Sequence, residues 1–269
     1  MEVKKVLFIS QEIAPYVPAN PLSQLSREMP QGIQERGAEV RTFMPKYGTI
    51  AERSNQLHEV IRLSGMNVII DDTDHPLIIK VATLQAARIQ VYFIYNEDYF
   101  ANSRIQELET VNSPGDNDER SIFFVRGVIE TVRKLRWVPN IIQCTGWITA
   151  LAPIYMRTIY ADDPSFRDAK IVTAMFNEPR PQDLDKRMAE KMVIDGVPKG
   201  VLKSIADQPV SYEQLMELSL KHSDAVLQCE PQLDDSLQQL ITASGLPTCS
   251  CVTPDGNDIQ AIYDFYASL

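Results

Sequence analysis

Lys4-Lys5-Val6-Leu7-Phe8-Ile9-Ser10, a run rich in β-branched and aromatic residues near the N-terminus, is the stretch that decides the fold. Its composition predicts a strand over residues 3–10, and the amphipathic stretch after it predicts a helix over residues 22–36. A second apolar run predicts another strand over residues 39–44. Strand, helix and strand in this order form a βαβ unit, which favours a parallel sheet with a right-handed crossover.

The loop between the first strand and the first helix contains three prolines and no glycine. It reads Glu12-Ile13-Ala14-Pro15-Tyr16-Val17-Pro18-Ala19-Asn20-Pro21. In an α/β protein, a phosphate would bind backbone N–H groups in this turn, at the N-terminus of the helix. Each proline removes an N–H donor and fixes its own φ, and the missing glycines remove the freedom to wrap an anion. The sequence therefore predicts the scaffold of a phosphate site without its usual cradle.

The rest of the chain alternates strand-like and helix-like segments. This alternation predicts an α/β, Rossmann-like fold, with a mostly parallel sheet and helices on both faces. The later segments are predicted as strands over 139–144, 170–174 and 225–229, and as helices over 118–136, 147–160, 232–242 and 258–268. A hairpin or meander is predicted over 59–95, with strands at 66–70, 77–81 and 89–94 and a polar turn at 71–74. A polar loop is predicted over 102–117, and a helix-rich insertion over 180–222. Because no repeat or linker divides the sequence, we expect residues 1–269 to form a single domain.

The composition argues against several classes of protein. A net charge of −10 and an isoelectric point near 4.9 disfavour nucleic acid and anionic membrane surfaces as partners. No apolar run reaches the ~20 residues of a membrane helix and no signal-peptide pattern is seen, so we expect a cytoplasmic protein. Four cysteines and three histidines predict neither a disulfide framework nor a metal site, and no cofactor is expected.

Several motifs, in the same order along the chain, are similar to one family. They are Val6 to Pro15, Gln34 to Arg41, Met44-Pro45-Lys46-Tyr47-Gly48, Asn117-Asp118-Glu119-Arg120, Pro139 to Ile142 with Trp147, and Ser223-Asp224-Ala225-Val226. Together they resemble the start of the catalytic region of bacterial glycogen synthases and plant starch synthases. The resemblance implies the N-terminal domain of a retaining glycosyltransferase of GT-B type. In such enzymes two Rossmann-like domains face each other across a cleft, and ADP-glucose binds mainly to the second.

The positions that carry the chemistry of this family differ in the present chain. Where the first loop of the family has a Lys, two glycines and an Asp, this chain has Pro18, Asn20, Pro21 and Gln24. The family segment His-x-His-Asp-Trp-His aligns with Gln143-Cys144-Thr145-Gly146-Trp147-Ile148, which keeps only the tryptophan. A phosphate would lose charge-assisted contacts of ~1.5 to 3 kcal/mol each, and the imidazoles that could move protons are gone. We therefore assign no catalytic residue, and ADP-glucose enters only as a candidate substrate.

Eight residues remain as candidates for binding a glucan or sugar: Glu12, Tyr16, Asn20, Asn117, Arg120, Trp147, Asn177 and Glu178. Two interpretations are open for Glu12: a hydrogen bond to a sugar hydroxyl, or a cap within the loop. Two are also open for Trp147: stacking on a glucan ring, or packing in the core. For Asn117 and Arg120 the preferred interpretation is a helix N-cap and a surface ion pair. Asn177 and Glu178 follow a predicted strand at the expected edge of the cleft, and form the best remaining polar group.

Three functional hypotheses follow. The first is a glycogen/starch synthase-like protein of α-glucan metabolism that lacks self-sufficient glucosyltransferase activity and acts as a glucan-binding or regulatory partner. The second is an active ADP-glucose-dependent glucosyltransferase that completes its cleft with a second polypeptide or as a homo-oligomer. The third is a scaffold domain that binds neither sugar nor nucleotide. Because one fold hosts many functions, the predicted fold alone does not choose among them.

Overall fold

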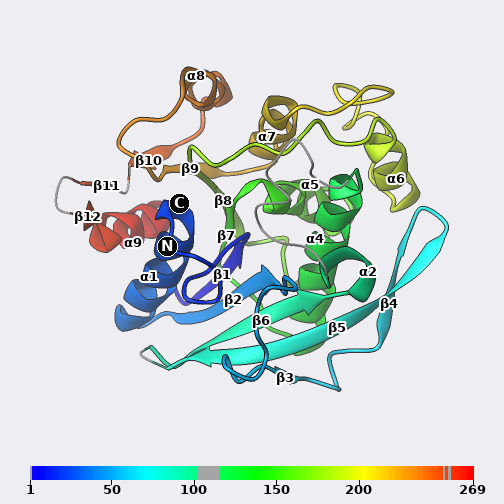
Figure 1. Ribbon diagram of the computed structural model, residues 1–269. Coiled ribbons are helices and arrows are strands. Elements are labelled where there is room, and N and C mark those ends of the chain that lie inside the picture. The colour runs from blue at the N-terminus through cyan, green and yellow to red at the C-terminus, as the bar shows by residue number, and fades with distance from the viewer. Residues whose placement is uncertain (1, 86, 102–114, 251, 254–255) are drawn as a thin grey trace.

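A mostly parallel sheet runs through the computed structural model of the chain, which describes residues 2–85, 87–101, 115–250, 252–253 and 256–269 (Figure 1). Its strands are β1 (Lys5–Ser10), β2 (Glu39–Pro45), β3 (His58–Glu59), β4 (Met66–Ile70), β5 (Thr73–Leu84), β6 (Ile89–Tyr95), β7 (Ile141–Thr145), β8 (Lys170–Met175), β9 (Ala225–Gln228) and β10 (Thr248–Ser250). Within the described residues their order is β10-β9-β8-β7-β1-β2-β6-β5-β3, and β4 pairs with β5. The predicted α/β fold with a mostly parallel sheet is confirmed.

The order of the strands reverses at β1. This strand pairs in parallel with β2 on one side and with β7 on the other. The parallel part continues to β6 beyond β2, and through β8 and β9 to β10 beyond β7. Antiparallel β5, β3 and β4 extend the sheet past β6. In open α/β sheets, ligands bind outside the carboxyl ends of the strands where the order reverses, so the ends of β1 and β7 mark the expected site.

Helices lie on both faces of the sheet. α1 (Pro21–Glu35) and α9 (Ile259–Ser268) pack side by side on one face (Figure 1). The opposite face carries α4 (Asn117–Leu135), α5 (Leu151–Arg157), α6 (Met188–Ile194), α7 (Tyr212–Leu220) and α8 (Asp235–Ser244). Four short elements complete the described chain: α2 (Glu97–Phe100), the 3₁₀ helix η1 (Trp147–Thr149), and the pair β11 (Val252–Thr253) and β12 (Gly256–Asn257).

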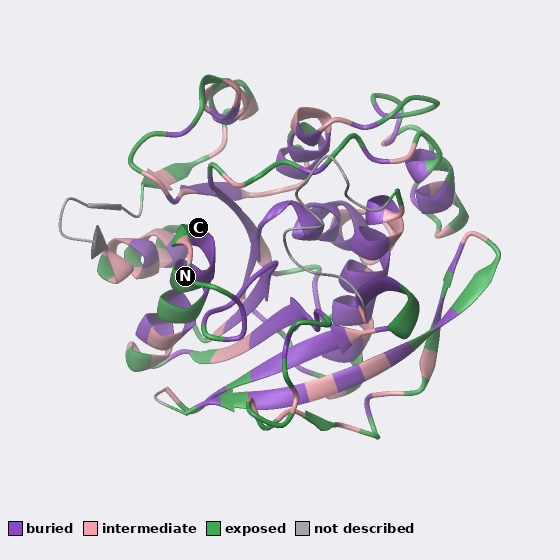
Figure 2. Cartoon of the chain, viewed as in Figure 1, coloured by how far each residue is buried: buried purple, intermediate pink, exposed green. Residues whose placement is uncertain are grey.

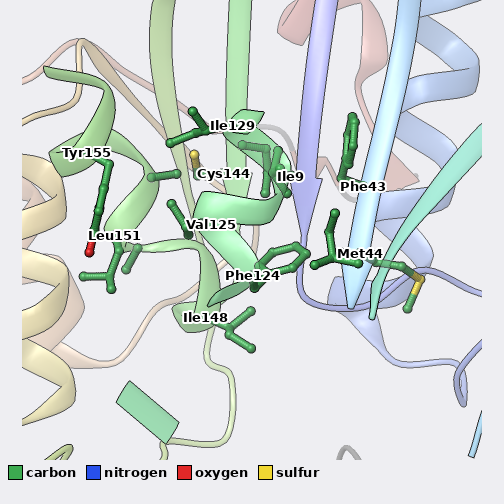
Figure 3. Close-up of a cluster of buried hydrophobic side chains, with 14 of the residues drawn as sticks. Ile9, Phe43, Met44, Phe124, Val125, Ile129, Cys144, Ile148, Leu151 and Tyr155 are labelled. Atoms are coloured by element: carbon green, nitrogen blue, oxygen red, sulfur yellow. The ribbon is translucent and has the colours of Figure 1, made fainter. Parts of the chain in front are cut away.

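Two hydrophobic clusters hold these layers together. Leu7 and Ile9 of β1 face the larger cluster beneath α4, while Val6 and Phe8 face the smaller one beneath α1 and α9. Figure 2 shows the resulting burial of the central strands, and Figure 3 shows strand side chains meeting those of α4. Burial on both faces explains why these strands read as continuous apolar runs rather than as alternating ones. Each fully buried large side chain contributes about 1.5 to 3 kcal/mol.

The structure corrects several predicted boundaries. The helix predicted over 147–160 is divided into η1 and a shorter α5 that ends at Arg157. The strand predicted over 77–81 is the middle of the longer β5, which begins at Thr73 because pairing with β4 carries it through polar residues. β10 was not predicted, since its three residues are too few to show a pattern. The loop predicted over 102–117 lies outside the described residues as far as residue 114.

The helix-rich insertion predicted over 180–222 contains α6 and α7, which confirms that prediction. No helix in the described ranges is long and apolar enough to cross a membrane. The expectation of a single domain over residues 1–269 stays a prediction.

The last helix completes the smaller cluster through a polar contact. Gln143 of β7 is 1% exposed and points to the face covered by α9. Its side-chain amide donates to Thr145 Oγ1 at 3.0 Å, and its Oε1 accepts the hydroxyl of fully buried Tyr266. α9 also lies close to α1, because a Cβ on Gly32 would be 2.5 Å from Ile259 Cγ2. The buried polar side chain of Gln143 in β7 therefore has its hydrogen-bond partners in Thr145 and in Tyr266 of α9.

We expect Tyr266→Phe to lower the free energy of unfolding by about 1 to 3 kcal/mol, because Gln143 Oε1 would stay buried without its donor. Urea denaturation monitored by circular dichroism measures this loss. The matched control is Tyr263→Phe on the same helix, whose partly buried hydroxyl has no hydrogen bond within the described part of the chain. Equal losses in the two variants would show that the contact with Gln143 contributes nothing.

Candidate functional site

The chain segments that follow β1 and β7 are locked together at the point where the strand order reverses. Gln11 N–H donates to Thr145 O at 2.9 Å, and Gln11 O accepts the Tyr47 hydroxyl at 3.0 Å. Gly146 has a φ of +88°, and a Cβ at this position would lie 2.5 Å from Gln11 Cβ. Only glycine fits this close approach in this backbone conformation. Beyond it, Ile148 N–H donates to Gln11 Oε1 at 3.4 Å.

Glu178, just after β8, lies at the same edge of the sheet, where a crevice is expected in this class of fold. Glu12, Asn20, Glu178, Tyr212 and the backbone of Trp147 gather here and are called the crevice below. Its carboxylate accepts Trp147 N–H at 3.1 Å and the Tyr212 hydroxyl at 3.0 Å. Burial raises the pKa of Glu178 to about 8, and the nearby charge of Glu12 adds to this shift, while the two hydrogen bonds oppose it. At neutral pH the protonated, uncharged form of Glu178 is therefore favoured.

The first loop uses its own groups at the N-terminus of α1. Asn20 caps the helix: its Oδ1 accepts Ser23 N–H at 2.7 Å, and its carbonyl accepts Gln24 N–H at 3.0 Å. The Ser23 hydroxyl accepts Asn20 N–H at 3.0 Å, and Pro21 has no N–H to offer. The side-chain amide of Asn20 donates to the carboxylate of Glu12, which is 2% exposed. A helix N-terminus that could hold an anion is thus already engaged by the protein itself.

The start of α4 differs from its predicted role. Asp116, not Asn117, is the N-cap residue, and its side chain makes no capping hydrogen bond. Asn117 is the first residue of the helix and is 3% exposed. Arg120 forms an ion pair with Asp116 at 3.2 Å; the Asp116 side chain is 38% exposed, whereas Arg120 itself is buried. The reason is tertiary, because this helical turn packs against η1, where Ser121 Oγ donates to Ile148 O at 2.9 Å.

A buried ion cluster beside this turn was not predicted. Lys191 of α6 places Nζ 2.7 Å from Asp118 Oδ2 and 2.7 Å from Glu119 Oε1. Glu119 also accepts the hydroxyl of Tyr99 at 2.8 Å. Burial raises the pKa of Asp118 against the opposing effect of Lys191. For Lys191, burial alone would lower the pKa, but the two carboxylates outweigh it and raise the pKa. Lys191 lies 73 positions from Asp118, so no local pattern signals the pair.

The remaining candidates divide between the crevice and other places. Trp147 is fully buried, and its ring packs in the larger cluster. Tyr16 packs edge-on against Phe93 with ring centres 4.9 Å apart, and burial raises the pKa of Tyr16 to about 12. Asn177 turns toward the segment before α8, where its Oδ1 accepts Asp234 N–H at 2.8 Å. The crevice thus joins Glu12, Asn20, Glu178 and the backbone of Trp147, with Asn117 and Arg120 beside it.

Tyr212 is the member of the crevice that sequence reasoning missed. It lies on α7, within the helix-rich insertion predicted over 180–222, and no motif marks it. Within the described ranges, no group of three or more His, Cys, Asp or Glu side chains is arranged to hold a metal ion. The polar groups of the crevice are one neutral acid, Glu178, and one carboxylate, Glu12, each of which accepts hydrogen bonds from its neighbours.

The raised pKa of Glu178 predicts a pH-dependent stability. The pKa of Glu178 is near 4.5 in the unfolded chain and about 8 in the folded protein. Between these two pH values, the folded protein holds a proton on Glu178 that the unfolded chain has lost. The free energy of unfolding should therefore fall as pH rises through this window. Urea denaturation at about pH 6 and about pH 9 measures the fall. Glu178→Gln should remove most of this fall, whereas Glu217→Gln, which changes an exposed side chain of α7, should leave it unchanged. An unaltered fall in Glu178→Gln would contradict the assignment.

Comparisons with known proteins show which family the chain resembles. The model of the starch synthase catalytic domain matches residues 5–248. The glycogen synthase of Chlorobium phaeobacteroides is 34% identical over 235 residues, which cover 87% of this chain and 47% of that protein. The glycogen synthase of Chlorobium limicola is 37% identical over 203 residues, which cover 74% and 41%.

A solved structure shares the fold. The catalytic domain of starch synthase IV from Arabidopsis thaliana, bound to ADP and acarbose, matches with a TM-score of 0.69 and 16% identity, over 93% of this chain and 51% of that chain. The chain spans about half the length of the curated relatives that it matches. The family match and the shared fold together establish that this chain belongs to the starch synthase catalytic domain family.

Proposed function

We propose that this chain is a glycogen/starch synthase-like protein of α-glucan metabolism that lacks self-sufficient glucosyltransferase activity and acts as a cytoplasmic glucan-binding or regulatory partner. The observation that carries the proposal is the first loop, where Asn20 and Ser23 cap α1 and Glu12 accepts the amide of Asn20. Membership of the family supports the link to α-glucan.

The charges around the crevice disfavour a diphosphate. Residues 6–26 contain no Lys or Arg, so the first loop brings no cation of its own. Lys191, the buried ammonium beside the crevice, already pairs with two carboxylates. Arg120, the guanidinium beside the crevice, pairs with Asp116. The diphosphate of a nucleotide-sugar would therefore approach the carboxylate of Glu12 among cations that already pair with carboxylates, and the repulsion between its negative charge and that of Glu12 is unfavourable. A neutral glucan meets no such repulsion, since its hydroxyl groups both donate to carboxylates and accept from amides.

A second candidate is an active ADP-glucose-dependent transferase whose cleft is completed by another polypeptide or by a second copy of this chain. It is favoured by the relatives, of which this chain matches about half. A third candidate is a scaffold that binds neither ligand. It is favoured by the hydrogen bonds that the crevice residues make to one another, from Asn20 to Glu12 and from Trp147 and Tyr212 to Glu178. Nucleic acid and anionic membranes stay unattractive partners for a chain of net charge −10.

Calorimetric titration with maltotetraose and with ADP-glucose tests these candidates. We expect saturable binding of maltotetraose, no binding of ADP-glucose, and no glucan elongation by the isolated chain. Elongation at about 1 s⁻¹ or faster, which is typical of enzymes, would contradict the proposal. Activity that appears only with an added partner would favour the second candidate, and absence of glucan binding would favour the scaffold.

Glu12→Gln tests the placement of the glucan in the crevice. This variant removes the charge but keeps an acceptor for the amide of Asn20. We expect the affinity for maltotetraose to fall about tenfold, which corresponds to about 1.4 kcal/mol. Glu217→Gln, an exposed carboxylate paired with Lys221 on α7, is the matched control and should bind normally. An equal affinity in the wild type and in Glu12→Gln would place the glucan elsewhere.

A further inference from the structure

Two lysines converge on one carboxylate oxygen at the carboxyl end of β2. Lys46 Nζ lies 3.3 Å from Glu52 Oε1, and Lys80 Nζ forms an ion pair with the same oxygen. Both ammonium nitrogens lie 5.1 Å from the centre of the Tyr95 ring. The side chains of Lys46 and Lys80 are only 8% and 15% exposed. Together Lys46, Lys80 and Tyr95 form a basic cluster on the described part of the sheet.

Among the described residues, the direct contacts of this basic cluster do not balance its charge. Two ammonium groups share the carboxylate of Glu52, the only carboxylate in the described ranges that forms an ion pair with either of them. Glu59 lies opposite Lys80 on β3 without an ion pair, and Glu97 acts on Tyr95 through its charge. Enclosing an ammonium group without a full counter-charge is unfavourable, since desolvation is repaid only by close, well-placed partners. The hydrogen bond from Lys80 and the contact with Lys46 hold the pKa of Glu52 below its usual range. With Glu52 in place one positive charge stays uncompensated, and an anion with two negative charges would match both ammonium groups only if it replaced Glu52.

The carboxylate that fills the basic cluster belongs to a surface segment. Glu52 is 42% exposed and lies in a run of turns after β2, whereas both lysines are held close to the sheet. Lys46 N–H donates to Ile94 O at 2.9 Å, which continues the pairing of β2 with β6. Lys80 lies within β5, opposite Phe93 of β6. A displacement of Glu52 toward solvent would therefore leave the backbone of both lysines in place.

The basic cluster lies at the edge of the sheet where ligands bind in this class of fold. Lys46 directly follows β2 and Tyr95 ends β6, and these two strands are parallel. Their carboxyl ends therefore share the edge that also holds the crevice at β1 and β7. β2 lies on the side of β1 away from β7, so the basic cluster and the crevice are separate places on one edge.

We propose that Lys46, Lys80 and Tyr95 form a binding site for a small phosphate-bearing anion, and that Glu52 occupies this site as an internal carboxylate that the anion displaces. A phosphate dianion neutralises both ammonium groups, whereas Glu52 neutralises one. Charge-assisted hydrogen bonds from two ammonium groups to phosphate oxygens are of the strong class. The site does not depend on the glucan proposal, because it uses other strands and an anionic ligand.

Titration of the whole chain with inorganic phosphate and with glucose 1-phosphate, at a constant ionic strength set by chloride, tests this site. We expect Glu52→Gln to bind phosphate about tenfold or more tightly than the wild type, since the competing charge is removed while its shape is kept. Adding Lys80→Met to that variant should weaken binding by about 10- to 100-fold, the equivalent of one charge-assisted contact. Tighter binding of inorganic phosphate would identify free phosphate as the ligand, and tighter binding of glucose 1-phosphate would identify a phosphate ester.

Lys221→Met is the matched control, because Lys221 forms an exposed pair with Glu217 at 2.6 Å on α7. It should leave phosphate binding unchanged. Equal affinities in the wild type and in Glu52→Gln would overturn the displacement of Glu52. An equal loss with Lys80→Met and Lys221→Met would show general attraction to lysines and overturn the site. Because Glu52→Gln keeps both buried lysines, its result stands even where Lys80→Met fails to fold. Neither Glu52→Gln nor Lys80→Met should alter the affinity for maltotetraose.

Discussion

The parallel pairing of β1 with β7 is the constraint on which the rest of the structure depends. It places the segment after β1 against the segment after β7, and the hydrogen bond between Gln11 and Thr145 extends the pairing beyond the strands. The backbone then turns at Gly146, where any side chain would collide with Gln11. This turn directs the N–H of Trp147 toward Glu178, so the crevice follows from the close approach of two strand ends.

The two parts of the carboxyl edge differ in charge. In the crevice, the neutral form of Glu178 is favoured, and Glu12 accepts a hydrogen bond from Asn20. Beside it, Lys191 forms ion pairs with two carboxylates. At the ends of β2 and β6, two ammonium groups share one carboxylate instead. The loop after β1 therefore supplies no positive charge at this edge, whereas Lys46 after the neighbouring strand β2 and Lys80 on β5 do. That difference is why we propose a neutral glucan for the crevice and an anion for the basic cluster.

Much of the fold could be predicted because periodicity and turn residues are local signals. The βαβ unit, the hairpin region and the two-sided burial of the strands all follow from the pattern of apolar residues. The candidate site was harder. Asn117 and Arg120 read as surface residues after a polar loop, but packing on η1 buries them. Tyr212 and Lys191 carry no motif, since their partners lie far away in the chain.

The sequence by itself determined the alternation of strands and helices, the family, and a first loop without glycine or cation. Each of these is a property of neighbouring residues or of their order. Only the tertiary structure decided that Glu178 meets Trp147 and Tyr212. The physical reason is that strand order and helix packing set which distant groups meet. Burial then sets the pKa of Glu178 and the charge that a ligand encounters.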